Sequence, residues 1–149
     1  MSETITVRFK LASIEDERCC ISTDKSDFSN LSVDTLKFQY KTETIIQMSR
    51  NTILVRADIK YSHEKRELLS ASAVFNYSVT GLGQAIIVDL ENQCISVKAD
   101  IFPSLLEVSY NSLRGMVYNQ TAGTSLAQYP MPIVDTKELV AKNGITVEE

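Results

Sequence analysis

The chain has 149 residues, of which 44% are hydrophobic and 23% are charged, and its net charge is -4 at pH 7. This balance is typical of one globular domain, 1–149, and excludes a disordered chain. The acidic charge also excludes a broad basic surface, so we expect neither nucleic acid nor an anionic membrane as a partner.

The first ten residues, MSETITVRFK, lack the apolar region of a signal peptide. No segment approaches the ~20 apolar residues of a membrane span, so we expect no membrane insertion and a cytoplasmic location. Apolar residues alternate with polar ones over 5–11, which predicts a first strand. A polar crossover over 22–34 connects this strand to the next alternating segment.

Three further alternating segments, 36–48, 53–61 and 69–79, are joined by polar turns at 49–52 and 62–67. Each segment has an apolar face and a polar face, which is the pattern of a sheet that is solvated on one side. The short connections predict an antiparallel meander of three strands.

After Asp100 the apolar period changes to about 3.6, which predicts a long helix that ends near Ala122-Gly123. Pro103 falls in its first turn, where a missing N–H costs little. The stretch between the meander and this helix, 84–99, has a mixed pattern that predicts no single element.

A short second helix has clear end signals. Asp135 is the expected N-cap, Glu138 completes a capping box, and Asn143-Gly144 is the expected C-cap. Before it, Tyr129-Pro130-Met131-Pro132 predicts an extended segment, because a residue that precedes proline avoids the α region.

The residue types that carry catalysis are sparse in this sequence. His63 is the only histidine, and we expect it to lie in a solvated turn without a nucleophile beside it. Cys19, Cys20 and Cys94 are expected to be reduced thiols, since adjacent cysteines on a strand point to opposite faces and cannot easily hold one metal ion. The acidic run 15–17 is typical of a solvated surface.

Gly81-Leu82-Gly83 follows a strand but lacks the third glycine, the lysine and the hydroxyl of the phosphate-binding motifs. We therefore interpret it as a strand terminator. Together these observations predict that the chain is not an enzyme and that it uses no metal and no other cofactor.

Apolar residues outside the sheet and the main helix are more numerous than polar loops require. They lie in the crossover and near the C-terminus, and they are Phe28, Leu31, Val33, Tyr129, Met131, Leu139 and Val140. One interpretation is a satellite core that caps the sheet. The other is an adaptable apolar groove that binds extended peptide.

The stretch 123–135, GTSLAQYPMPIVD, followed by Leu139, resembles the C-terminal pattern of the SecB family of export chaperones. The order of the predicted elements resembles that family too. The resemblance implies an α+β fold with a four-stranded antiparallel sheet, formed by a strand, a long crossover and a three-strand meander. A long helix and a short C-terminal helix follow the sheet.

The resemblance also implies an ATP-independent holdase that binds unfolded polypeptides or preproteins in the groove of the seven residues named above. Family members assemble as a tetramer, a dimer of dimers, which implies an oligomer interface on the main helix. The interface residues would be Ile101, Leu105, Val108, Leu113 and Met116. The family's Trp-Pro-Glu stretch is absent here, and we do not extend docking on the export ATPase to this chain.

Three alternatives stay open at this point. Relatives of the same fold serve as dedicated chaperones for antitoxins. A different class of function is a cup of sheet and helix around a small ligand, which needs an enclosed pocket with convergent polar groups. A third is a subunit of a larger assembly that uses the helix only as an interface.

Overall fold

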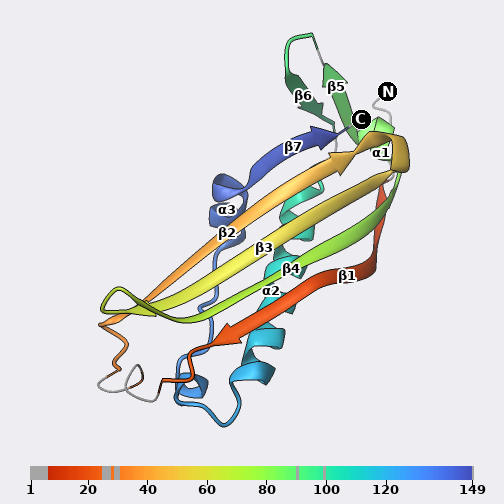
Figure 1. The fold of residues 1–149 in the computed structure, drawn as a ribbon. Helices are drawn as coiled ribbons and strands as arrows, with labels where there is room; N and C mark the ends of the chain where they lie inside the picture. The colour runs from red at the N-terminus through yellow and green to blue at the C-terminus, as the bar shows by residue number, and fades with distance from the viewer. Residues whose placement is uncertain (1–6, 25–27, 29–30, 90, 99, 149) are drawn as a thin grey trace.

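The computed structural model describes residues 7–24, 28, 31–89, 91–98 and 100–148, and Figure 1 shows their arrangement. The strands are β1 (Arg8–Ile21), β2 (Leu36–Gln47), β3 (Thr52–His63), β4 (Arg66–Thr80), β5 (Ile86–Asp89), β6 (Cys94–Val97) and β7 (Gly144–Glu148). The helices are α1 (Leu82–Ala85), α2 (Phe102–Thr121) and α3 (Thr136–Lys142), with 3₁₀ turns η2 (Met48–Arg50) and η3 (Ser125–Gln128).

Within the described residues the main sheet has five strands in the order β1-β4-β3-β2-β7. The predicted α+β class, the crossover and the meander are confirmed, but the sheet is mixed and not a purely antiparallel sheet of four strands. The difference is β7, which pairs in parallel with β2 from Glu43↔Gly144 to Gln47↔Glu148. A strand of five residues at the sheet edge leaves too short an alternation to be recognised in the sequence.

β1 extends past the end of the predicted strand 5–11 and continues through the acidic run as far as Ile21, while residues 5 and 6 of that prediction lie outside the described residues. Its pairing with β4 is interrupted between Leu11 and Ser13 and again between Glu15 and Arg18, and Asp16 has a φ of 51°. Such bulges shift the alternation and so hide a strand from pattern analysis. Cys19 and Cys20 lie beyond the second bulge, one half-buried and the other exposed.

The hairpin between β3 and β4 turns at only two residues, Glu64 and Lys65, whose φ values are 50° and 66°. Positive φ at both positions is what a two-residue hairpin turn requires. The predicted turn at 62–67 is therefore too long, and the predicted solvated position of His63 is wrong. His63 ends β3 on the same face as Tyr61 and is only 6% exposed.

α1 begins in the predicted strand terminator and ends in the segment 84–99, for which no element was predicted. The rest of that segment contains a hairpin of β5 and β6, which projects beyond one end of the main sheet (Figure 1). One face of this hairpin carries four aliphatic side chains, Ile86, Val88, Ile95 and Val97. Only Ile86 is fully buried.

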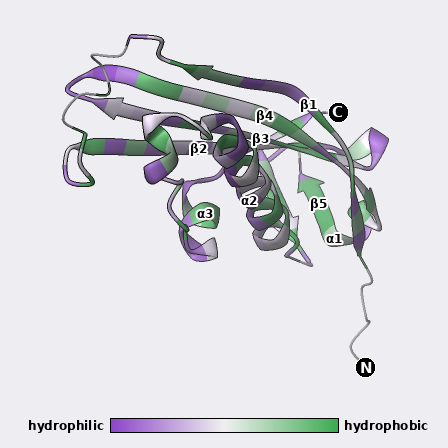
Figure 2. Cartoon of the chain, turned by 90° about the horizontal axis from the view of Figure 1, so that it is seen from below, coloured by the Kyte–Doolittle hydropathy of each residue, from purple (hydrophilic) through white to green (hydrophobic). Residues whose placement is uncertain are grey.

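The core lies between one face of the sheet and α2, which packs mainly on β3 and β4. Phe75 and Tyr77 of the sheet and Leu105 and Leu113 of the helix are fully buried there. The Tyr77 hydroxyl lies 2.7 Å from the Ser109 hydroxyl inside this core. Figure 2 shows α2 and α3 on the same side of the sheet, so the opposite face is bare, as the alternation predicted.

α3 begins as predicted, because the Asp135 side chain accepts a hydrogen bond from the Lys137 N–H at 2.9 Å. Its end differs from the prediction. Asn143 is extended (φ -76°, ψ 129°), so the chain does not make a left-handed cap but runs on into β7. No helix in the described part of the chain is long and apolar enough to cross a membrane.

Candidate polypeptide-binding surface beside β2

Four segments adjoin β2. The end of the crossover at 31–35 leads into it, the extended segment 129–135 passes behind the sheet to reach α3, and α3 and β7 lie beside it (Figure 1). Each exposes one large apolar side chain to solvent. These are Val33 at 79%, Ile133 at 83%, Val140 at 38% and Ile145 at 45% exposure. We call the surface defined by these four side chains the β2-edge surface.

The outer edge of β2 is only partly paired. β7 covers Glu43 to Gln47, and no other strand among the described residues lies beside Leu36 to Thr42. Half of the strand therefore presents backbone N–H and C=O groups outward. Such an edge can pair with an extended polypeptide.

Aromatic side chains lie on the inner face behind this edge. The Phe38 ring centroid is 5.2 Å from that of Tyr61 and 6.2 Å from that of Tyr40. Tyr40 in turn meets Tyr110 of α2 at 5.6 Å with a steep interplanar angle of 64°. Phe38 and Tyr40 are half-buried, so this cluster joins the core to the β2-edge surface.

Side-chain donors hold the extended segment against this cluster. The Tyr61 hydroxyl donates to the Tyr129 carbonyl at 2.8 Å, and the Tyr110 hydroxyl donates to the Pro132 carbonyl at 2.6 Å. Arg114 Nε donates to the Met131 carbonyl at 3.2 Å. These three donors fix an extended backbone that has no strand partner of its own, since none of its residues belongs to a strand.

The same segment is tied to the crossover. The Tyr129 hydroxyl donates to the Leu31 carbonyl at 3.1 Å, across 98 positions of the sequence. A hydrogen bond thus connects the extended segment to the end of the crossover.

The buried tyrosines predict a loss of stability at alkaline pH. Burial raises the pKa of Tyr61 to about 12, although the Arg114 guanidinium nearby opposes the shift. The unfolded chain ionises near pH 10, so the stabilisation is complete below pH 10 and is lost as the pH rises to 12. We expect the free energy of unfolding to fall by about 1.4 kcal/mol per pH unit for Tyr61 alone.

Urea unfolding between pH 9 and pH 12 measures this slope. Tyr61→Phe should make it shallower, while Tyr118→Phe, at a side chain that is 67% exposed, should leave it unchanged. Equal slopes for the two variants would contradict the buried position of Tyr61.

α3 rests on a polar part of β2. Tyr40, Thr42 and Thr44 face it from the strand, and the Thr44 hydroxyl donates to Asn143 Oδ1 at 2.9 Å. The Thr42 hydroxyl is buried and has no hydrogen bond to any described residue, while the Glu138 carboxylate of α3 lies near the buried Tyr40 hydroxyl. Lys142 Nζ lies 5.0 Å from the centre of the Tyr40 ring. Burial, followed by the Glu138 carboxylate, raises the pKa of Tyr40.

The seven predicted groove residues divide into three groups by their exposure. Val33 and Val140 are exposed. Phe28 and Leu31 are half-buried against the core, and Tyr129 is half-buried. Met131 and Leu139 are only 3% and 1% exposed. These two cannot contact a partner in this conformation, because α2 and the sheet already cover them, and they belong to the satellite core that was the other interpretation.

The predicted interface residues divide in the same way. Ile101, Leu105 and Leu113 are buried against the chain's own sheet, at 7%, 0% and 0% exposure. The sheet therefore covers more of the helix stripe than expected. Val108, 39% exposed, and Met116, half-buried, remain accessible on α2.

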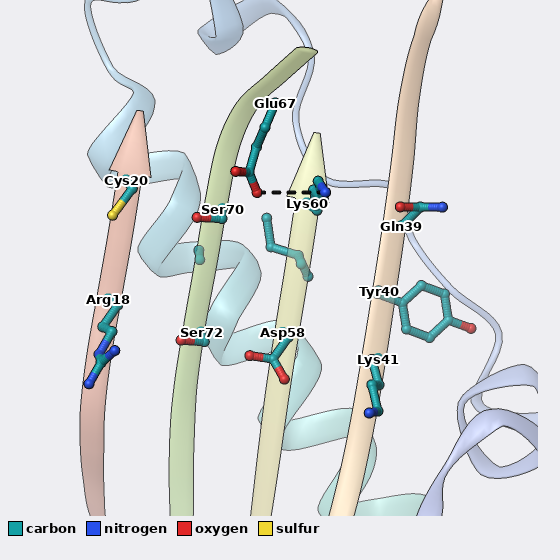
Figure 3. Close-up of a pocket in the computed structure, with 12 residues that line it drawn as sticks. Arg18, Cys20, Gln39, Tyr40, Lys41, Asp58, Lys60, Glu67, Ser70 and Ser72 are labelled. Carbon is teal, nitrogen blue, oxygen red and sulfur yellow. Dashed lines mark ion pairs between the residues drawn. The ribbon is translucent and has the colours of Figure 1, made fainter. Parts of the chain in front are cut away.

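The bare face of the sheet contains a shallow hollow of about 660 Å³, shown in Figure 3. Charges of both signs line it, and they pair with one another: Lys60 Nζ lies 3.9 Å from Glu67 Oε1, and nearby Arg56 Nε lies 3.4 Å from Asp58 Oδ2. All four side chains are substantially exposed. We interpret this face as a solvated sheet surface.

The remaining candidates for chemistry lie apart. Cys19, Cys20 and Cys94 are free thiols, and burial raises the pKa of Cys19, which makes it less reactive. Asn92 donates to Asp89 and so lowers the pKa of that carboxyl. Among the described residues, no three His, Cys, Asp or Glu side chains are grouped so that they could hold a metal ion.

The sequence pattern does not predict Ile133, Ile145 or the three donors Tyr61, Tyr110 and Arg114 as part of a site. Ile133 carried a usable signal, because an isoleucine directly after Pro-Met-Pro has no neighbouring strand in which to be buried. The donors carried none, since their partners are backbone carbonyls far away in the sequence. A scan against known family models and a search of curated proteins found no match to this chain.

Proposed function

We propose that this chain is an ATP-independent holdase that binds unfolded or extended apolar polypeptide along the β2-edge surface. The observation that carries the proposal is the combination of four exposed apolar side chains with an unpaired strand edge beside them. Apolar contacts and main-chain hydrogen bonds together bind extended polypeptides with little sequence preference. The order of elements, which resembles that of the SecB family, supports the same proposal.

A cup around a small ligand is less well supported. Such a site would need space between the sheet and α2, and that space is filled by fully buried side chains such as Phe75, Tyr77 and Leu105. The hollow on the opposite face is wide, shallow and lined with paired charges. Neither place offers an enclosed apolar pocket.

The test is suppression of aggregation by the chain at near-stoichiometric ratio to a chemically unfolded protein, without nucleotide. Ile133→Asp places a charge on the β2-edge surface and should raise the apparent Kd about tenfold or more, because an apolar contact is lost and a carboxylate is desolvated. Ile87→Asp, at a 49% exposed site on the projecting hairpin, is the matched control and should have no effect.

Two outcomes would refute the proposal. In the first, the unmodified chain does not delay aggregation at any ratio. In the second, Ile133→Asp and Ile87→Asp change the apparent Kd equally. Urea unfolding of both variants confirms that each remains folded, which is expected because both side chains are exposed.

We extend the proposal to assembly as a tetramer, a dimer of dimers, through the outer face of α2. Val108 and Met116 are the predicted interface residues that remain accessible there. Light scattering should give four times the chain mass, and Val108→Glu should lower it. A monomer at all concentrations would contradict this part of the proposal only.

A further inference from the structure

β7 is held in place by few side-chain contacts. Its residues are exposed except for Val147, which is half-buried, and none is fully buried. Gln47 Nε2 donates to Glu148 Oε2 at 3.0 Å, and both side chains are near the solvent. The strand therefore depends on backbone pairing with β2, in the parallel arrangement that is slightly less stable per residue.

The element that precedes β7 is short and contributes little to the core. α3 has seven residues, and Leu139 is its only buried side chain. On the neighbouring part of β2 the Thr42 hydroxyl is buried without a hydrogen-bond partner among the described residues, and it would gain one from water if a movement of α3 exposed it. Hydration of this hydroxyl would therefore offset part of the free-energy cost of moving α3 and β7 away from β2.

β7 has the chemistry that an extended ligand of this edge would need. Ile145 and Val147 lie opposite Thr44 and Ile46, on the side of the core, while Gly144, Thr146 and Glu148 alternate with them. Ile145 stays 45% exposed on that side. The part of the β2 edge that β7 occupies continues directly into the unpaired edge of Leu36 to Thr42, so removal of β7 would give one uninterrupted edge of twelve residues.

We propose that β7 is a self-masking strand, which occupies part of the polypeptide-binding edge of β2 and is displaced by an extended segment of the bound polypeptide. This inference rests on the holdase function proposed above and adds the binding mode and its regulation. The displacing segment would have alternating apolar side chains and would pair with β2 along 36–47. If β7 masks the site in most molecules, the apparent affinity equals the intrinsic affinity multiplied by the fraction of molecules in which the edge is open.

A disulfide staple tests the inference in the full-length chain. Gln47→Cys and Glu148→Cys, with the three native cysteines replaced by serine, would join paired residues of neighbouring strands. Strands lie about 4.8 Å apart, which is within the range that a disulfide spans. The probe is reduced and alkylated α-lactalbumin, which stays unfolded, and its Kd is measured by fluorescence anisotropy.

The opposite variant frees the edge. Ile145→Pro with Thr146→Pro places prolines at adjacent positions of β7. Because successive N–H groups of a strand point alternately toward and away from its neighbour, one of the two prolines removes an N–H group that would donate to β2. We expect the oxidised staple to bind about tenfold more weakly than its own reduced form, and the proline variant to bind about tenfold more tightly than the unmodified chain. Gln47→Cys alone controls for the substitution.

The outcomes separate this inference from the holdase proposal. If the unmodified chain binds the probe and neither variant changes the Kd, self-masking is wrong and the holdase proposal stands. If no form binds the probe, both fail. If the proline variant forms a larger assembly than the unmodified chain in light scattering and no longer binds the probe, a second copy is the occupant of the edge and the inference is overturned. The staple comparison decides even where the proline variant does not fold.

Discussion

Met131→Asp is expected to lower the free energy of unfolding by at least about 4 kcal/mol. Met131 is 3% exposed and packs in the core cluster, so the variant loses buried apolar contacts and places a carboxylate where water does not reach. A total stability of about 5–15 kcal/mol makes this loss large enough to unfold much of the chain near 37 °C. Urea unfolding followed by circular dichroism measures it.

The control is Met131→Leu, which keeps the volume and should cost less than about 1.5 kcal/mol. The result distinguishes two roles for this residue. Sequence analysis placed Met131 in a binding groove, where the aspartate variant would stay folded and lose only polypeptide binding. An aspartate variant with unchanged stability and weakened binding would therefore contradict the buried position and restore the groove.

Tyr110→Ala is the second substitution for which we expect a large effect, about 3–5 kcal/mol of destabilisation. Tyr110 is 1% exposed, packs against Tyr40, and donates to the Pro132 carbonyl. The alanine removes the ring and the donor together. Tyr110→Phe removes only the donor and should cost about 1 kcal/mol.

The difference in destabilisation between Tyr110→Ala and Tyr110→Phe gives the contribution of the ring without that of the hydrogen bond. Tyr118→Ala, on the exposed side of the same helix, should change stability by less than about 0.5 kcal/mol. Thermal or urea unfolding of the three variants is sufficient. An alanine variant at position 110 that is as stable as the one at position 118 would show that Tyr110 does not anchor the extended segment.

The parts of the fold with a clear period were predictable. The meander and α2 follow patterns of 2 and 3.6 residues over ten or more positions, and the N-cap at Asp135 was read correctly from a short motif. β1 was only partly predictable, because two bulges and the positive φ of Asp16 disturb its alternation. The hairpin turn at Glu64-Lys65 was misjudged because neither residue is glycine or asparagine.

β7 and the burial of Met131 and Leu139 could not be predicted, because both depend on tertiary contacts. A five-residue strand is stabilised here by pairing with β2, about 100 positions earlier in the chain. Met131 and Leu139 follow polar or proline-containing stretches that resemble exposed loops, and only the packing against α2 and the sheet encloses them. Val33 and Val140 are exposed, and their role in a binding groove stays a prediction.

The most direct test of polypeptide binding beside β2 is a hydrogen-exchange footprint of the unmodified chain with and without reduced, alkylated α-lactalbumin. We expect the unfolded protein to slow exchange in 31–42, which contains the unpaired outer edge of β2 at 36–42, and to leave the β5–β6 hairpin unchanged. Protection confined to β1 or to the hairpin, with none in 31–42, would contradict the account.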